Sequence, residues 1–303
     1  MQNYEDLQIS AAASGPSAAA IGRLFGNDTV PDDPFELKLE SKIVGSSIEL
    51  DPLHLEIGAM RIDATAKIDD FPSPDGASAK VHISGPDFGR FNKLLGLPGK
   101  LTGPFQLDAS ISALPGKKAD VSLDASAEDV SLALRGILVE APGFAGSSIE
   151  FTASGQSFRT IAQAINLERA PADPFELKVQ LEKEASASKL TAAGLRIGGD
   201  QLTLTGRIGD EPLKLHTNIS FELSGQDFRR TLTEYGVSAE TMPASSWSAS
   251  GNVVRESDRF SVRQASATIG VDRDYTLLLD GHLSDDSRLV GSAANIELSG
   301  KSL

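Results

Sequence analysis

Apolar and polar residues alternate with a period of two over long stretches of the chain. After Pro34, the apolar residues Phe35, Leu37 and Leu39 alternate with charged ones. The same alternation recurs in 62–68, 121–125, 175–181, 202–208, 213–215 and 275–279. Because successive side chains of a strand point to opposite faces, this pattern predicts antiparallel strands with one apolar and one polar face.

The dipeptide Ser-Gly divides the chain into repeats. It occurs at Ser14, Ser84, Ser154 and Ser224, at a spacing of 70 residues, and again at Ser299. We therefore expect a single elongated repeat domain over 1–303. Its repeats would span 14–83, 84–153, 154–223 and 224–298, with a fifth beginning at 299. Since stable arrays usually end in atypical capping units, we also expect the chain to be a fragment of a longer array.

A short helix is predicted at the start of each repeat. Phe88, Phe158 and Phe228 fall in one column, with further apolar columns three and seven residues on, which is the spacing of one helical face. The last of these columns is followed by Gly26, Gly96, Asn166 or Gly236. Gly and Asn tolerate the left-handed conformation that ends helices, so we expect helices of about 8–10 residues.

The remainder of each of the first three repeats begins with a proline and an aromatic residue, as in DPFELKL from Asp33 and GPFQLDA from Gly103, and SSWSASG around Trp247 stands in this place in the fourth. About 45–50 residues remain there, enough for about five strands of ordinary length. The fold class that we expect is therefore mainly β. It is an elongated repeating antiparallel β-sheet curled into an open groove, with one short helix per repeat of about 70 residues.

Charge and composition narrow the range of partners. Asp and Glu number 42 against 28 Lys and Arg, a net charge of −14 that repels polyphosphate, so we expect no nucleic-acid partner. The absence of cysteine excludes disulfides and thiolate metal sites. Only 6% of residues are aromatic, which is little bulk for a thick core between two sheets.

The apolar face needs a covering, and two explanations remain open. Either the sheet curls enough to bury itself, or the face lines a groove for a ligand, because one three-turn helix per repeat is too small a cover. Under the second explanation, the candidate lining residues are Leu37, Leu39, Ile62, Ala64, Ile68, Leu107, Val121, Leu123, Leu177, Val179, Leu181, Leu202, Leu204, Ile208, Trp247, Leu277 and Leu279.

Motifs of the second repeat resemble the AsmA family of bacterial envelope proteins, which belongs with the TamB-like repeating β-groove proteins. They are the start at Ser84, the segment LLGLP (94–98) and the segment GPFQL (103–107). The resemblance implies a periplasmic protein of Gram-negative cells that shields phospholipid acyl chains in a β-groove between inner and outer membranes. It also implies an inner-membrane anchor outside this chain. The alternative is an envelope scaffold or chaperone-like module for outer-membrane protein assembly.

Catalytic motifs are not recognisable in the sequence. His54, His82, His216 and His282 lack metal-ligand spacing, and no Gly-x-Ser-x-Gly elbow or phosphate-binding loop occurs. We expect no enzymatic activity, no metal and no cofactor. The helix residues Phe88, Phe158 and Phe228 either anchor each helix to the sheet or line the mouth of the groove.

Overall fold

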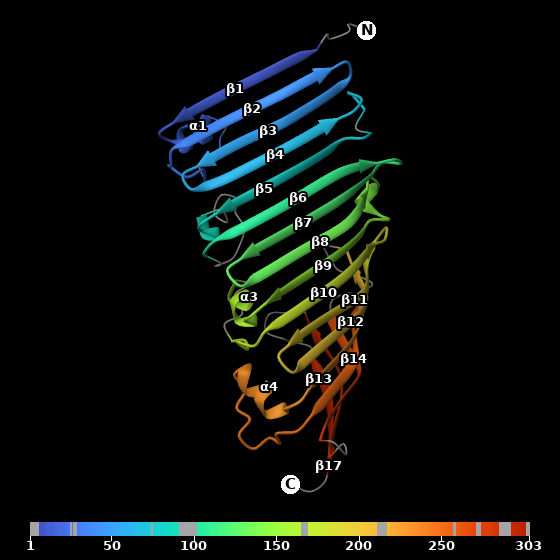
Figure 1. Ribbon diagram of the computed structural model, residues 1–303. Helices are drawn as coiled ribbons and strands as arrows, with labels where there is room; N and C mark the ends of the chain where they lie inside the picture. The colour runs from blue at the N-terminus through green and yellow to red at the C-terminus, as the bar shows by residue number, and fades with distance from the viewer. Residues whose placement is uncertain are drawn as a thin grey trace. The chain divides into compact units, whose positions relative to one another are not determined.

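The computed structural model describes residues 6–24, 26, 29–73, 75–90, 102–164, 169–210, 217–256, 259–270, 274–284 and 292–300. The chain divides into two compact units. The N-terminal unit comprises Met1–Glu140 with Thr160–Leu167, and the C-terminal unit comprises Ala141–Arg159 with Glu168–Leu303. Each unit is built on an antiparallel sheet (Figure 1).

The described residues form seventeen strands. In the N-terminal unit these are β1 (Leu7–Gly15), β2 (Phe35–Val44), β3 (Ser47–Ile57), β4 (Met60–Ile68), β5 (Ser78–Gly85), β6 (Phe105–Leu114), β7 (Lys118–Ala127) and β8 (Val130–Val139). In the C-terminal unit they are β9 (Ser148–Gly155), β10 (Phe175–Lys183), β11 (Ala187–Ile197), β12 (Asp200–Gly209), β13 (Asn218–Gly225), β14 (Trp247–Glu256), β15 (Arg259–Ile269), β16 (Tyr275–Ser284) and β17 (Ala293–Gly300). Within each unit every strand pairs with the next along the chain.

Within the described residues each repeat contributes four strands, one fewer than the five or so expected, and the expected alternating segment 213–215 lies outside those residues. The first repeat holds β2 to β5, and the strands of the molecule are 8 to 11 residues long. The expectation of about five assumes strands of about 5–6 residues, the commonest length in globular proteins, and these strands are longer. The mainly β, repeating and antiparallel fold class predicted from the sequence is confirmed.

The helices are shorter than expected, with seven residues each. They are α1 (Ala18–Leu24), α3 (Phe158–Ala164) and α4 (Phe228–Glu234), and a 3-10 turn, η1 (Pro142–Phe144), precedes β9. The helix expected in the second repeat begins at Phe88, but 91–101 lie outside the described residues. The α4 helix begins as predicted, because the Asp227 carboxylate accepts a hydrogen bond from the Arg230 N–H at 3.0 Å.

Matching hydrogen bonds show that the four repeats share one local structure. The backbone N–H of the residue four positions after each Ser of Ser-Gly donates to the loop that precedes the next strand. These bonds are Ala18 to Asp33, Phe88 to Gly103, Phe158 to Asp173 and Phe228 to Ser245, at 2.8 to 2.9 Å. The Ser-Gly dipeptide itself ends β1, β5, β9 and β13.

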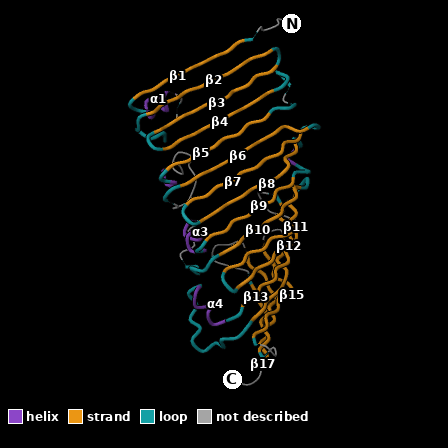
Figure 2. Tube along the Cα trace, viewed as in Figure 1, coloured by secondary structure: helices purple, strands orange, loops and turns teal. Residues whose placement is uncertain are grey.

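Each sheet is a single open layer. Within each unit the strands lie side by side with the helices at one end of them, and the sheet of the C-terminal unit twists progressively from β9 to β17 (Figure 2). The chain exposes 18,750 Å², against about 12,000 Å² for a compact protein of 31.9 kDa. Single layers account for this excess, because both faces of a one-layer sheet are open to solvent.

The glycine of each Ser-Gly makes room for an aromatic side chain on the following strand. Gly15 lies opposite Phe35, Gly85 opposite Phe105, and Gly225 opposite Trp247. A Cβ atom built on Gly85 would come within 2.7 Å of the Phe105 ring, and one on Gly225 would collide with Trp247 and the Asp200 carboxylate. The dipeptide therefore serves packing at the strand end.

We predict that Gly225→Ala destabilises the C-terminal unit by about 1–3 kcal/mol, the usual cost of overpacking. Urea unfolding followed by Trp247 fluorescence measures it. The control is Gly194→Ala in β11, where no atom lies within 4 Å of the added methyl group, and it should leave the midpoint unchanged or raise it. Equal effects of the two substitutions would contradict the packing role.

Candidate functional site: an apolar face closed at one rim

One face of the N-terminal sheet is apolar from strand to strand. The register joins one residue from each of the eight strands into a row, and neighbouring members of the row are direct cross-strand partners. The central row consists of Ala11, Leu39, Leu53, Ala64, Val81, Ala109, Leu123 and Leu134. This side of the sheet is called the apolar face, and the opposite side the polar face.

The C-terminal sheet has an apolar face of the same kind. One of its rows runs without interruption through nine strands. Its members are Ala153, Leu177, Leu195, Leu202, Leu223, Ala249, Ala267, Leu277 and Leu298. At about 4.8 Å per strand, such a row is about 38 Å wide.

All seventeen residues proposed from the sequence as groove lining lie on these apolar faces. Eight are in the N-terminal unit, from Leu37 to Leu123, and nine in the C-terminal unit, from Leu177 to Leu279. Every one of them is half-buried, neither fully buried nor fully exposed. Neighbours in the sheet cover their sides, and the half-burial leaves part of each side chain open above the face.

Aromatic pairs close the face at one rim. The helix rim is the end of the strands where Ser-Gly, the helices and the first aromatic residue of the following strand (Phe35, Phe105, Phe175 or Trp247) meet. Phe88 packs edge-on against Phe105, Phe158 against Phe175, and Phe228 against Trp247, with ring centroids 5.5 to 5.8 Å apart. Phe105 and Phe175 are only 6% and 3% exposed. The helix phenylalanines therefore anchor the helices to the sheet.

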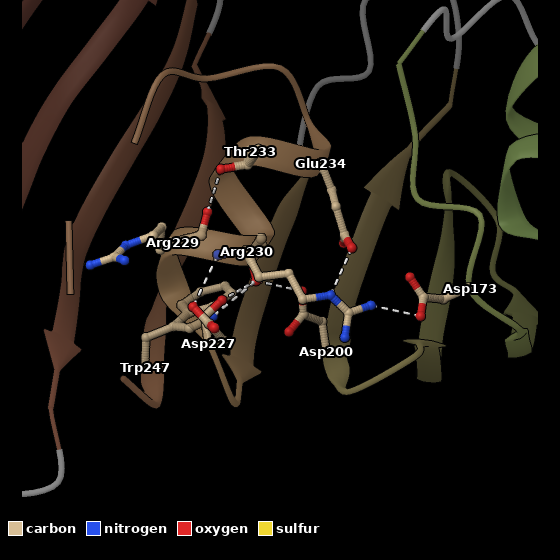
Figure 3. Close-up of polar contacts among 9 residues, drawn as sticks. Asp173, Asp200, Asp227, Arg229, Arg230, Thr233, Glu234 and Trp247 are labelled. Atoms are coloured by element: carbon tan, nitrogen blue, oxygen red, sulfur yellow. Dashed lines mark hydrogen bonds and ion pairs between the residues drawn. The ribbon is translucent and has the colours of Figure 1, made fainter. Parts of the chain in front are cut away.

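Polar contacts at α4 complete this rim in the C-terminal unit (Figure 3). Thr231 donates to the Asp200 carboxylate at 2.6 Å, and the Trp247 indole N–H lies 3.3 Å from the Thr231 hydroxyl. The Arg230 guanidinium lies between Glu234 at 2.7 Å and Asp173 at 2.6 Å. The hydrogen bonds that Arg230 donates to the Asp173 and Glu234 carboxylates raise the pKa of Arg230 further above its ordinary value, so Arg230 is charged at every physiological pH.

An arginine of one repeat forms an ion pair with an aspartate of the repeat before it. Arg230 of α4 pairs with Asp173, and Arg90 pairs with Asp33 at 3.2 Å in the N-terminal unit. Asp173 and Asp33 occupy the same position in their repeats, directly before Pro-Phe. The backbone carbonyl groups of the same two aspartates accept hydrogen bonds from the first residue of the helix in their own repeat. This residue therefore ties two successive helices to one strand end.

The polar face of the N-terminal unit carries a series of histidine and carboxylate pairs. His54 Nδ1 lies 2.6 Å from Asp63 and its Nε2 lies 3.3 Å from Glu56, while His82 Nδ1 lies 2.7 Å from Asp108. The hydrogen bond to Asp63 raises the pKa of His54, and His82 lowers the pKa of Asp108. Carboxylates engage both ring nitrogens of His54, so neither nitrogen is open to a substrate proton.

Two hollows lie on the polar face of the C-terminal unit. One of about 460 Å³ is lined by small hydroxyl residues with Glu222, and one of about 380 Å³ lies over Gly194 beside Lys178 and Arg196. Both lie where serine, threonine or glycine leaves space between longer side chains. The sequence predicts a groove lined by the apolar residues. These two hollows lie instead on the polar face.

Within the described residues, no three His, Asp or Glu side chains are arranged to hold a metal ion. None of the helices in the described part of the chain is long and apolar enough to cross a membrane. His216, one of the four histidines considered from the sequence, lies outside the described residues, as does the segment 94–98. Comparison of the chain with family models, curated proteins and solved structures found no match.

Sequence reasoning missed part of this surface. It omitted Phe151, Leu195 and Phe221, which belong to the apolar face although the same period of two marks them. It also could not pair histidines with carboxylates, because Asp108 lies 26 residues from His82. The sequence signal for the helix rim is the recurrence of Ser-Gly together with Pro-Phe in the first three repeats.

We predict that Asp63→Asn lowers the pKa of His54 towards its ordinary value of about 6.5, because the neutral amide no longer stabilises the imidazolium. An NMR titration of the ring protons measures this. A histidine whose pKa is raised on folding adds stability below about pH 6.5, and that stability is lost as pH rises through the folded-state value. Asp124→Asn, which removes a partner of Arg135, should leave the titration unchanged.

Proposed function

We propose that the chain is a lipid-binding segment whose apolar faces shield acyl chains from water, as part of a lipid-transfer protein. The observation that carries the proposal is the apolar face itself. Its rows cross all the strands of a unit, and most of their side chains are half-buried, although Ala153 is buried and Ala11 and Leu298 are exposed. Exposed apolar surfaces of this extent are rare in monomeric proteins and mark sites of interaction.

The chemistry of the face favours hydrocarbon over peptide. The backbone N–H and C=O groups of the interior strands are used in the sheet ladders, so the face offers a ligand only side-chain hydrocarbon. A peptide lying on it would leave its own amide groups without partners, which costs several kcal/mol in total. An acyl chain has no such groups, so it suits this surface better than an unfolded protein does.

The energetic gain is sufficient for binding. A phospholipid with two tails has about 30 methylene groups, and each contributes about 0.8 kcal/mol when it leaves water. A face that covers half of the tail surface therefore contributes about 12 kcal/mol before the costs of ordering. Alanine at several central positions, such as Ala64, Ala109 and Ala193, keeps the surface low enough for chains to lie across it.

The resemblance of the second repeat to the AsmA family supports the same function. It would place the protein in the periplasm, held to the inner membrane by a segment outside this chain, with phospholipid as cargo. An envelope scaffold or chaperone-like module remains the alternative, and it would use the same face or the strand edges for protein partners. Lipid extraction of the purified protein followed by mass spectrometry tests between them, since the proposal requires bound phospholipid.

We predict that Leu204→Lys reduces lipid binding at least tenfold, because acyl chains would have to lie against a hydrated ammonium group. Binding of a fluorescent phospholipid measures it, with circular dichroism as a check on folding. The control is Thr203→Lys, whose side chain is on the polar face opposite Glu222 and should leave binding unchanged. Equal loss in both variants would point to a general effect of charge and would contradict the proposal.

Photo-crosslinking groups at Leu123, Leu204 and Leu279 should all capture phospholipid in cells. The three positions lie on the apolar faces of three different repeats. Capture at only one position would indicate a local pocket, and capture of protein alone would favour the chaperone-like alternative. A lipid-free dimer in solution would show that a second copy covers the face.

A further inference from the structure

The two rims of the C-terminal apolar face differ in charge. At the helix rim the cluster around α4 contains four carboxylates, from Asp173, Asp200, Asp227 and Glu234, and three guanidinium groups, from Arg229, Arg230 and Arg169, which donates to the Gly236 carbonyl. Arg230 is held by two of these carboxylates, and Arg229 Nε donates to the Met242 carbonyl. The helix rim therefore has a net negative charge, which opposes an anionic headgroup.

The far rim, at the opposite ends of the strands, carries cations on the apolar face. Lys183 follows Phe175, Leu177, Val179 and Leu181 at every second position of β10, so it shares their face. Arg255 holds the corresponding place in β14, after Val253. The backbone N–H groups of Lys183 and Arg255 make equivalent bonds to the carbonyl groups of Ser147 and Thr217.

Both cations lie at the end of their strand, directly after its last apolar side chain on the apolar face. The Lys183 amino group lies 2.7 and 2.8 Å from the Asp210 carboxylate oxygens, at the turn beyond the strand. The Arg255 guanidinium lies 4.6 Å above the Phe260 ring. In the N-terminal unit the equivalent positions are Ile43 and Ala113, so the charge is a property of the C-terminal repeats.

The distance between the rims suits one acyl chain. Phe175 and Lys183 are eight positions apart, which is about 27 Å along an extended strand. The hydrocarbon core of a bilayer is about 30 Å thick, so one leaflet's chain needs about 15 Å. A tail that starts beside Lys183 therefore ends before it reaches the aromatic pair of Phe158 and Phe175.

We propose, resting on the lipid-binding function above, that a phospholipid lies along the strands of the C-terminal unit in one direction. Its phosphate is at the far rim beside Lys183 and Arg255, and the methyl ends of its tails point to the aromatic pairs at the helix rim. The net negative charge of the α4 cluster disfavours the reverse direction. The headgroup side of the face is therefore fixed by charge, and the tail side by aromatic packing.

Trp247 is the only tryptophan and stands at the helix rim, so its fluorescence reports the depth of the bound tails. The probes are two phosphatidylglycerols brominated either near the methyl end or near the carbonyl end of the acyl chains. The methyl-end probe should quench Trp247 more strongly. A double variant, Trp247→Phe with Val253→Trp, moves the reporter next to Arg255, and the order of quenching should reverse.

Equal or inverted quenching at both positions would overturn the proposed direction while leaving lipid binding intact. Failure of both probes to quench either reporter, together with an absence of extracted lipid, would overturn the lipid-binding function itself. The two failures are therefore distinguishable.

Charge variants test the headgroup site independently. Lys183→Gln and Arg255→Gln should each weaken phosphatidylglycerol binding about tenfold, as expected when a charged hydrogen bond is lost. Asp210→Asn should strengthen it, because it removes the carboxylate that neutralises the Lys183 amino group, which keeps its hydrogen bonds to the Glu184 and Ala187 carbonyl groups. The control Lys178→Gln, on the polar face beside Glu150, should change nothing. Unchanged affinity in Lys183→Gln and Asp210→Asn, or an equal loss for uncharged diacylglycerol, would overturn the headgroup site.

Discussion

The absence of a second layer over the sheet is the constraint on which the other features depend. Backbone hydrogen bonds satisfy every interior strand within the plane, so the apolar side chains gain cover only from their neighbours in the sheet. Among the described residues, few large side chains are almost completely buried, for example Phe175, Phe105 and Val130. Stability therefore comes from many half-buried contacts along regular rows, and the same rows leave hydrocarbon open to a ligand.

The helix rim supplies the dense packing that the faces lack. Gly85 and Gly225 admit the rings of Phe105 and Trp247, and the phenylalanine of the neighbouring helix covers each ring. Ion pairs such as Arg90 with Asp33 add a link from each of these helices to the preceding repeat. Buried side chains also occur toward the other end of the strands, for example Ala187, Leu190 and Ser147.

Polar and apolar faces are separated with few exceptions, and those exceptions are informative. Asp200 stands on the apolar side at the helix rim, where Thr231 satisfies its carboxylate. Lys183 stands on the apolar side at the far rim, where Asp210 pairs with it. In the described rows, charged groups on the apolar side occur only at the helix rim and at the far rim. A bound amphiphile would therefore meet hydrocarbon along its tails and charge at its ends.

The sequence by itself determined the strand character, the repeat of 70 residues and the parity of all seventeen candidate lining residues. A period of two is a local property, and the pleat converts it directly into a shared face. Only the tertiary structure decided which strands are neighbours, that Gly85 faces Phe105, that His82 meets Asp108, and that cations lie at one rim. Those relations depend on register between residues far apart in the chain, and register is fixed by packing across the whole sheet.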